Sequence, residues 1–197
     1  MVIDGLPPPA ETLISQSDLR TRVPQLAGEI SAHYSDSVPI LISVLKGSAL
    51  FLADLARAIA IEVEIDFMSI SSYQSSGAQS GVVKIVKDLE SDISGRDVLI
   101  VEDIVDTGLT LNYLRRTLEE REPASLRAVT LLDKSARRIV PVPLEWSGFE
   151  IPDVFVVGYG LDFQGRYRNV PDLLAVKDLA RLANNPLLLV PTLFEAV

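Results

Sequence analysis

The sequence predicts an α/β protein with a central, mostly parallel sheet flanked by helices, and three observations lead to that fold class. Unbroken apolar runs, typical of strands buried on both faces of a parallel sheet, occur at residues 38–45, 98–101 and 126–132. The first two runs are followed by segments with apolar residues at helical spacing. The length of 197 residues suits one such domain with a small appendage and is too short for two domains.

Composition excludes several classes of protein. A net charge of −9 argues against a general nucleic-acid surface. No apolar run has the length of a membrane span and the start lacks the pattern of an export signal, so a cytoplasmic protein is expected. With no cysteine and a single histidine, His33, a structural zinc site is not expected. His33 has no acidic neighbours in sequence and is expected at the surface.

The chain is expected to begin with an irregular arm, residues 1–10, because three consecutive prolines occur there. A helix is predicted from Ser17, the N-cap candidate, to Tyr34, since apolar residues fall on one face at helical spacing. Pro24 lies inside this pattern and is expected to kink or split the helix.

The buried strand at 38–45 ends in the turn Lys46-Gly47-Ser48, which leads into an almost wholly apolar helix at 49–59. A strand, a tight glycine turn with a lysine and a buried helix is an arrangement that suits an anion site. Residues 61–67 then alternate between apolar and acidic side chains, which predicts a strand with one wet face towards an edge of the sheet.

Residues 69–81 are rich in Ser, Gly and Gln, and residues 82–87 return to an alternating strand pattern. The segment is therefore predicted to be the long tip of a β-hairpin. Long loops in compact domains are often lids or binding loops, so residues 75–80 are expected to be mobile and to order when ligands bind.

The segment 95–118 carries the clearest chemical signal. Glu102 and Asp103 follow a buried strand and so are expected at the carboxyl edge of the sheet, where open α/β folds bind ligands. The small-residue turn 106–110 then enters a helix, which Thr107 or Thr110 is expected to cap. Such a turn presents backbone N–H groups to a phosphate monoester, and Gly108 permits close approach.

An acid pair beside a phosphate turn fits a ribose 5-phosphate, because neighbouring carboxylates each accept a hydrogen bond from one hydroxyl of a cis-diol. Neither a Walker-type loop nor a dinucleotide fingerprint is present in the sequence. Lys134 follows the strand at 126–132 and is also expected at the carboxyl edge. Arg137 and Arg138 are expected to be solvated and to add positive potential.

The stretch VLIVEDIVDTGLTL resembles the phosphoribosyl-pyrophosphate motif of type I phosphoribosyltransferases, and its detail is most similar to hypoxanthine (hypoxanthine-guanine) phosphoribosyltransferases. Four motifs within residues 13–176 lie in the family's order. The resemblance implies a single domain, 1–197, with a small hood and a flexible β-hairpin loop. It also implies Mg²⁺-dependent transfer of phosphoribosyl from 5-phosphoribosyl 1-pyrophosphate to a 6-oxopurine in purine salvage, by a homodimer or homotetramer.

The resemblance also implies roles for individual residues. Asp106 would accept the proton that leaves N7 of the purine, and the peptide before Lys46 would be cis. The phosphoribosyl and pyrophosphate site would comprise Glu102, Asp103, Asp106, Thr107, Gly108, Leu109, Thr110, Lys46, Gly47, Ser72, Tyr73 and Arg168. The purine would meet Lys134, Phe155, Val156 and Asp162, and Mg²⁺ would meet Asp162, Glu102 and Asp103, the last two touching the metal or only the ribose.

Lys134 would select the base, because an ammonium group has donors only and therefore suits a 6-oxo group but not a 6-amino group. Two departures from the family occur near Asp162, where Phe163 and Gly165 replace a common tyrosine and a larger polar residue. The alternatives are a xanthine- or guanine-preferring transferase and a non-catalytic regulator that senses phosphoribosyl pyrophosphate. The tail, 179–197, is atypical, and its apolar run is expected to pack on this domain or on a neighbouring subunit.

Overall fold

The computed structural model describes residues 8–73 and 82–194, which divide into two compact units. The larger unit is Arg22–Pro152, and the smaller combines Met1–Thr21 with Asp153–Val197. In the described part of the chain, no helix has both the length and the apolar character needed to cross a membrane.

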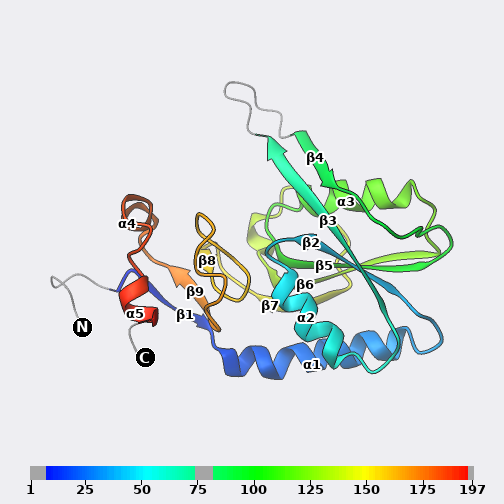
Figure 1. Ribbon diagram of the computed structural model, residues 1–197, viewed down its shortest axis with the longest axis horizontal. Coiled ribbons are helices and arrows are strands. Elements are labelled where there is room, and N and C mark those ends of the chain that lie inside the picture. The colour runs from blue at the N-terminus through cyan, green and yellow to red at the C-terminus, as the bar shows by residue number, and fades with distance from the viewer. Residues whose placement is uncertain (1–7, 74–81, 195–197) are drawn as a thin grey trace. The chain divides into compact units, whose positions relative to one another are not determined.

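The larger unit is built on a six-stranded sheet in the order β4-β3-β2-β5-β6-β7 (Figure 1). Neighbouring strands from β3 to β7 are parallel, and β4 pairs antiparallel with β3 as the second arm of the predicted hairpin. The fold class predicted from the sequence is confirmed. The strands are β2 (Ile40–Leu45), β3 (Glu64–Tyr73), β4 (Val82–Lys87), β5 (Asp97–Val105), β6 (Ser125–Asp133) and β7 (Trp146–Glu150).

The apolar runs form the centre of this sheet, as their composition predicts. Residues 40–44 of β2 and 98–102 of β5 are buried throughout, since helices cover the sheet on both sides. Helix α3 (Leu109–Glu119) packs its predicted stripe of Leu111, Leu114 and Leu118 into a core shared with β2 and β5. Helix α2 (Ala49–Ala58) buries Phe51, Leu52 and Leu55 and contacts β2 and β5.

The alternation predicted for residues 61–67 holds for Glu62 and Glu64, which are exposed, but is reversed at Ile65 and Asp66. Ile65 is 46% exposed, whereas Asp66 is 5% exposed. The Asp66 carboxylate accepts backbone N–H groups from Phe67, Glu90 and Ser91, at 2.7 to 2.9 Å. These hydrogen bonds compensate the burial and lower the pKa of Asp66 against the desolvation that would raise it. Asp66 thereby ties the chain after β4 to the base of the hairpin.

Helix α1 (Gln16–His33) continues through Pro24, so the predicted split does not occur. The helix begins one residue before Ser17, and Ser15 provides the cap instead. The Ser15 hydroxyl accepts the Asp18 N–H at 3.1 Å, and the Asp18 carboxylate accepts the Ser15 N–H at 3.2 Å. This reciprocal pair satisfies two backbone donors at the helix start. His33 is exposed, as expected.

The smaller unit contains an antiparallel sheet in the order β1-β9-β8, with β1 at Ala10–Ile14, β9 at Leu173–Val176 and β8 at Phe155–Val157. This is the small hood that the resemblance implied. The tail forms α4 (Leu179–Asn184) and α5 (Val190–Phe194). Leu182 and Leu189 of the tail are buried in the core of this unit, so the tail packs on its own chain.

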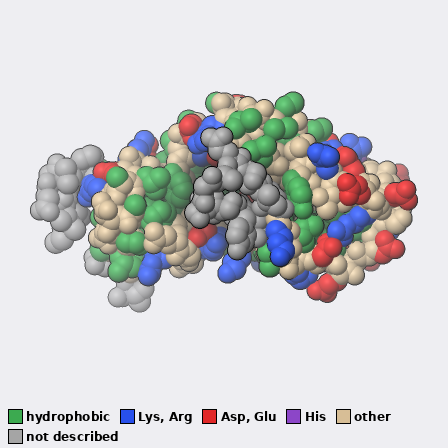
Figure 2. Space-filling model, turned by 90° about the horizontal axis from the view of Figure 1, so that it is seen from above, with side chains coloured by type: hydrophobic (Ala, Val, Ile, Leu, Met, Phe, Trp, Pro, Cys, Tyr) green, Lys and Arg blue, Asp and Glu red, His purple; other side chains and the backbone are tan. Residues whose placement is uncertain are grey.

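The surface reflects the mixed charge of the chain. On the face drawn in Figure 2, Lys and Arg side chains are interspersed with Asp and Glu. Among the described residues, several charged side chains form exposed ion pairs, for example Arg121 with Asp88 at 2.8 Å and Lys87 with Glu90 at 3.1 Å. Exposed pairs of this kind contribute little to stability, so their main effect is on solubility and on the local potential.

Candidate active site

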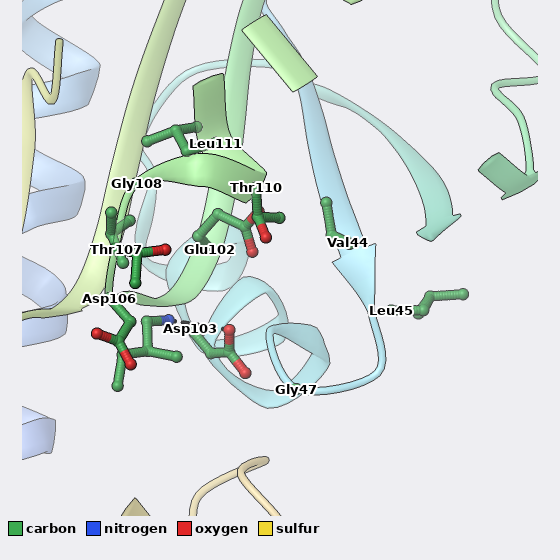
Figure 3. A pocket seen from close by; sticks show the side chains of 12 residues that line it. Val44, Leu45, Gly47, Glu102, Asp103, Asp106, Thr107, Gly108, Thr110 and Leu111 are labelled. Atoms are coloured by element: carbon green, nitrogen blue, oxygen red, sulfur yellow. Dashed lines mark hydrogen bonds between the residues drawn. The ribbon is translucent and has the colours of Figure 1, made fainter. Parts of the chain in front are cut away.

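A cavity of about 310 Å³ lies in the larger unit, at the carboxyl end of β5 and the start of α3 (Figure 3). Three chain segments form it: the end of β2 with its turn, the acid pair with the residues that follow it, and the first turn of α3. The position matches the expected ligand edge of a parallel sheet. Its lining is Val44, Leu45, Gly47, Glu102, Asp103, Ile104, Val105, Asp106, Thr107, Gly108, Thr110 and Leu111.

The predicted phosphate turn has a glycine, and not a threonine, as its helix cap. Gly108 is the N-cap of α3 with a φ of 85° and has no side chain to cap the helix. The Leu109 N–H donates to the Thr107 hydroxyl with an N–O distance of 3.5 Å, at the outer limit of a hydrogen bond. The expected threonine cap is present only as this one long hydrogen bond from the residue before the N-cap. With so weak a side-chain cap, the N–H groups of the first turn of α3 remain available to an anionic ligand.

The turn after β2 lies directly against the acid pair. The Leu45–Lys46 peptide is cis, as the resemblance implied. A Cβ atom at Gly47 would lie 1.6 Å from Asp103 Oδ2, so a glycine is required for the carboxylate to stay in this place. Figure 3 shows Asp103 beside the Gly47 turn. Ser48, the last residue of the turn, is tied to β2 by a hydrogen bond, because its buried hydroxyl lies 2.6 Å from the buried hydroxyl of Ser43.

The two carboxylates of the acid pair have different surroundings. Glu102 is 6% exposed, and its Oε1 has no hydrogen-bond partner in the part of the chain described. Asp103 accepts its neighbour's backbone N–H, from Ile104, at 2.9 Å. Burial, together with the nearby charge of Asp103, raises the pKa of Glu102 well above its usual range. An unpartnered buried carboxylate oxygen in a cavity is a strong sign of a missing polar ligand.

Glu102→Gln is expected to raise the stability of the ligand-free protein at neutral and alkaline pH, where the wild type loses stability because the buried Glu102 carboxyl must ionise. Because the folded-state pKa of Glu102 is raised, the folded protein binds more protons, and its stability falls as pH rises from about 4.5, the ordinary pKa, through the raised value. The variant should match the wild type near pH 4 and exceed its Tm above the raised pKa. The difference in Tm should be about 3–5 °C for each pH unit by which the pKa of Glu102 is raised.

Thermal unfolding of both proteins without ligands or Mg²⁺, from pH 4 to pH 9, measures this difference. Glu90→Gln is a suitable control because Glu90 has an 83% exposed side chain. A Tm difference between wild type and Glu102→Gln that stays constant with pH would contradict the buried, proton-binding carboxyl.

Asp106 borders the cavity and has a partner that was not expected. Arg137 Nε lies 3.1 Å from Asp106 Oδ1. This contact is an ion pair rather than an aligned hydrogen bond, since that oxygen has no hydrogen-bond partner among the described residues. Arg138 forms an ion pair with Asp133 and is only 18% exposed, so its expected solvation is wrong. Arg137 remains 45% exposed.

The segment after β6 is held against the phosphate turn. The N–H groups of Ile139 and Val140 both donate to the Thr107 carbonyl, at 2.9 and 3.2 Å. A side chain at Gly108 would lie 2.6 Å from the Val140 carbonyl oxygen. Lys134, the first residue of this segment, is 6% exposed and donates its backbone N–H to Val105 at 3.0 Å. The structure thus places Lys134 beside the end of β5.

Four of the predicted residues belong to the smaller unit. Asp162 and Arg168 form an ion pair with an oxygen–nitrogen distance of 2.5 Å. Asp162 Oδ2 also accepts the Gly165 N–H at 2.6 Å. Phe155 is 37% exposed and has an edge contact with Phe163, whereas Val156 is buried. An exposed aromatic ring beside a buried backbone suits stacking on a planar ligand.

The remaining predicted residues lie on the hairpin. Ser72 and Tyr73 are the last residues of β3, in register with Val83 and Val82 of β4. Their side chains, and the lid predicted at 75–80, lie outside the described residues.

The residues present suit a magnesium ion that is coordinated partly by the protein and partly by a substrate. Among the described residues, no group of three or more His, Asp or Glu side chains could hold a metal alone. The cavity nevertheless offers the unpartnered Oε1 of Glu102. Mg²⁺ usually takes one or two protein carboxylates and completes its octahedron with phosphate oxygens and water. The donor set therefore fits Mg²⁺ bound together with a pyrophosphate.

Two features of the site were not predicted from the sequence. The pairing of Arg137 with Asp106 depends on a contact across 31 positions, and only the two adjacent arginines shortly after Lys134 hinted at it. The close approach of Gly47 to Asp103 was also not predicted, because the two residues are distant in sequence.

The chain is similar to known proteins in sequence and in fold. Residues 15–164 match the family model described as phosphoribosyl transferase domain. The chain is 49% identical over 163 residues to the hypoxanthine phosphoribosyltransferase of Escherichia coli strain K12, which covers 82% of this chain and 92% of that protein. It is 47% identical over 167 residues to the hypoxanthine-guanine phosphoribosyltransferase of Bacillus subtilis strain 168, covering 85% and 93%. A hypoxanthine phosphoribosyltransferase structure from Staphylococcus aureus superimposes with a TM-score of 0.82 at 40% identity, covering 86% and 92%.

Proposed function

We propose a reaction for this chain from the premise that it belongs to the hypoxanthine (hypoxanthine-guanine) phosphoribosyltransferases of the type I phosphoribosyltransferase family. The chain is an enzyme of purine salvage. In the proposed reaction, the phosphoribosyl group of 5-phosphoribosyl 1-pyrophosphate is transferred to hypoxanthine, and also to guanine. Its products are the nucleoside 5′-monophosphate and pyrophosphate.

The observation that carries this proposal is the cavity between the acid pair and the weakly capped start of α3. A helix start with so weak a side-chain cap suits the 5-phosphate, because its N–H groups and the helix dipole both favour an anion. Glu102 and Asp103 would then accept hydrogen bonds from the two ribose hydroxyls. The ribose hydroxyl that meets Glu102 would satisfy the carboxylate oxygen that has no partner among the described residues.

Breaking the bond between C1 and the pyrophosphate develops positive charge on the ribose and negative charge on the leaving group. Lys46 and Arg168 are proposed to bind the pyrophosphate. Asp106, with its carboxylate at the cavity edge, is proposed to accept the proton from N7 of the purine. When bound, Mg²⁺ supplies positive charge to the pyrophosphate, and Asp162, Glu102 and Asp103 are the proposed protein ligands.

The purine is proposed to stack on Phe155 and to bond along its edge to the Val156 backbone. Lys134 is proposed to donate to the 6-oxygen. Lys134 follows the end of β6 and is only 6% exposed, so solvent has little access to its side chain. A fixed cluster of donors favours an oxygen acceptor over an amino group.

Of the two alternatives named from the sequence, the xanthine- or guanine-preferring transferase remains open. A xanthine- or guanine-preferring transferase would differ at the purine 2-position, near Asp162. A non-catalytic regulator would be expected to carry a basic face, whereas this chain has a net charge of −9. A homodimer or homotetramer is also proposed, and light scattering would measure its mass.

An initial-rate panel tests the reaction. Hypoxanthine, guanine, xanthine, adenine, uracil and orotate are each supplied with phosphoribosyl pyrophosphate, in the presence of Mg²⁺ or of a chelator. We expect turnover with hypoxanthine and guanine, a poor rate with adenine and none with the pyrimidines. Absence of transfer to any base, with phosphoribosyl pyrophosphate still bound, would favour the regulator. A preference for xanthine would favour the other enzyme.

A further inference from the structure

Tyr167 lies between Arg166 and Arg168 in the sequence and has no role in the proposed reaction, yet it is buried and hydrogen-bonded. It is 3% exposed and lies in the core of that unit with Leu182 of α4 and Leu189 of the tail. Its hydroxyl donates to the Pro186 carbonyl, which belongs to the linker between α4 and α5. The side chain is therefore anchored on the tail by packing and by a hydrogen bond.

The backbone at Tyr167 adopts a conformation that needs such an anchor. Its φ of 72° lies in the left-handed region, which bulky residues rarely occupy. A residue in this region persists where surrounding contacts determine it. The Tyr167 carbonyl also accepts the Val170 N–H at 3.1 Å, which closes a turn directly around Arg168.

Arg168 takes its orientation from this turn. Its carbonyl accepts the Gly160 N–H at 2.9 Å, and its guanidinium donates to the Gly160 carbonyl. The same guanidinium forms the ion pair with Asp162. A change in the backbone at Tyr167 would therefore move the arginine and the carboxylate together.

The tail also borders the loop at a second place. A pocket of about 400 Å³ is lined on one side by Val190 and Phe194 of α5. The other side is formed by the loop segment with Tyr167 and Arg168 at its centre. The tail thus contacts the loop through the Tyr167 hydroxyl, through the buried leucines and along this pocket.

We propose that Tyr167, anchored on the C-terminal tail, is a positioning residue that holds Arg168 and Asp162 in the geometry that binds magnesium pyrophosphate. The inference rests on the proposed function, because it takes Arg168 and Asp162 as the pyrophosphate and metal ligands. It gives the atypical tail a role in substrate binding through contacts within one chain.

Two variants and one control test the proposal. Tyr167→Phe keeps the buried ring and removes only the hydrogen bond to Pro186. Leu182→Ala loosens α4 from the core. Leu187→Ala, also in the tail but 50% exposed, is the control. Titration calorimetry with pyrophosphate and Mg²⁺ measures binding, initial rates separate KM from kcat, and light scattering measures the mass.

Tyr167→Phe is expected to weaken binding of magnesium pyrophosphate by about 3- to 10-fold, the usual effect of one lost hydrogen bond. Leu182→Ala is expected to weaken it at least as much, and Leu187→Ala less than twofold. KM for phosphoribosyl pyrophosphate should rise in parallel, with kcat within twofold and the mass of Tyr167→Phe equal to that of the wild type. The Tm of Tyr167→Phe should fall by only a few degrees, because the lost hydrogen bond also contributes to folding stability.

Unchanged affinity in both Tyr167→Phe and Leu182→Ala would overturn the proposal, and so would a loss that accompanies a change in mass. Failure of the proposed function gives a different result. In that case the wild type transfers no phosphoribosyl group to any base, and weaker pyrophosphate binding by Tyr167→Phe would still support the positioning role.

Discussion

Asp106→Asn is expected to lower kcat by about 10²- to 10⁴-fold, the usual contribution of a positioned general base. An asparagine has nearly the same shape, but its amide oxygen does not take a full proton from N7 of the purine. The ion pair with Arg137 is partly exposed, so its loss is expected to cost at most about 1 kcal/mol of stability. KM for phosphoribosyl pyrophosphate is expected to change less than threefold.

Steady-state rates with hypoxanthine, together with thermal unfolding, measure both parts of this prediction. Asp88→Asn is a matched control, since Asp88 also pairs with an arginine, Arg121, on the surface of the same unit. The control should keep the wild-type rate. Turnover by Asp106→Asn within twofold of wild type would remove Asp106 from the role of base. A loss of rate in Arg137→Gln with normal activity in Asp106→Asn would assign the effect to the arginine.

Patterns of local apolar residues predicted the central strands and the stripe on α3 well, because burial on a flat sheet or on one helix face repeats at a fixed period. Leu111, Leu114 and Leu118 are all buried as their spacing predicts. The acid pair lines the cavity near the carboxyl edge, as predicted. However, β5 continues through Glu102 and Asp103 to Val105, so the end of the apolar run at Val101 did not mark the end of the strand.

Predictions failed where distant hydrogen bonds determine the outcome. Asp66 is buried because two backbone N–H groups, from Glu90 and Ser91, converge on it from across the hairpin. No local pattern contains those donors, so the faces of Ile65 and Asp66 were predicted the wrong way round, whereas Glu62 and Glu64 are exposed as predicted. The predicted solvation of Arg138 failed for a related reason. Its ion pair with Asp133 forms only because the chain turns back between these two residues.

The caps of the two helices show a limit of a different kind. Ser15 and Ser17 are both acceptable N-cap residues, and only the side chain of Asp18, three residues after Ser15, distinguishes them. At α3 the threonines were favoured by type, but Gly108 takes the cap with its positive φ. In an anion site, a weak side-chain cap is itself useful, because a strong cap would compete with the phosphate.

Lys134→Met is expected to lower kcat/KM for hypoxanthine by about 10- to 200-fold, the effect of removing a charged hydrogen-bond donor from a buried site. Methionine fills a similar volume without a charge, so the fold is expected to persist although Lys134 is only 6% exposed. Discrimination against adenine should fall at the same time, since the 6-amino group no longer meets an ammonium group.

Rates with hypoxanthine and adenine for wild type and variant measure both effects. Lys177→Met is a matched control, because Lys177 forms an exposed ion pair with Glu11. It should leave both rates unchanged. If Lys134→Met lowered kcat/KM for the two bases by the same factor, the lysine would stabilise the site without recognising the 6-position. Selection of a 6-oxopurine would then have to come from backbone groups such as that of Val156.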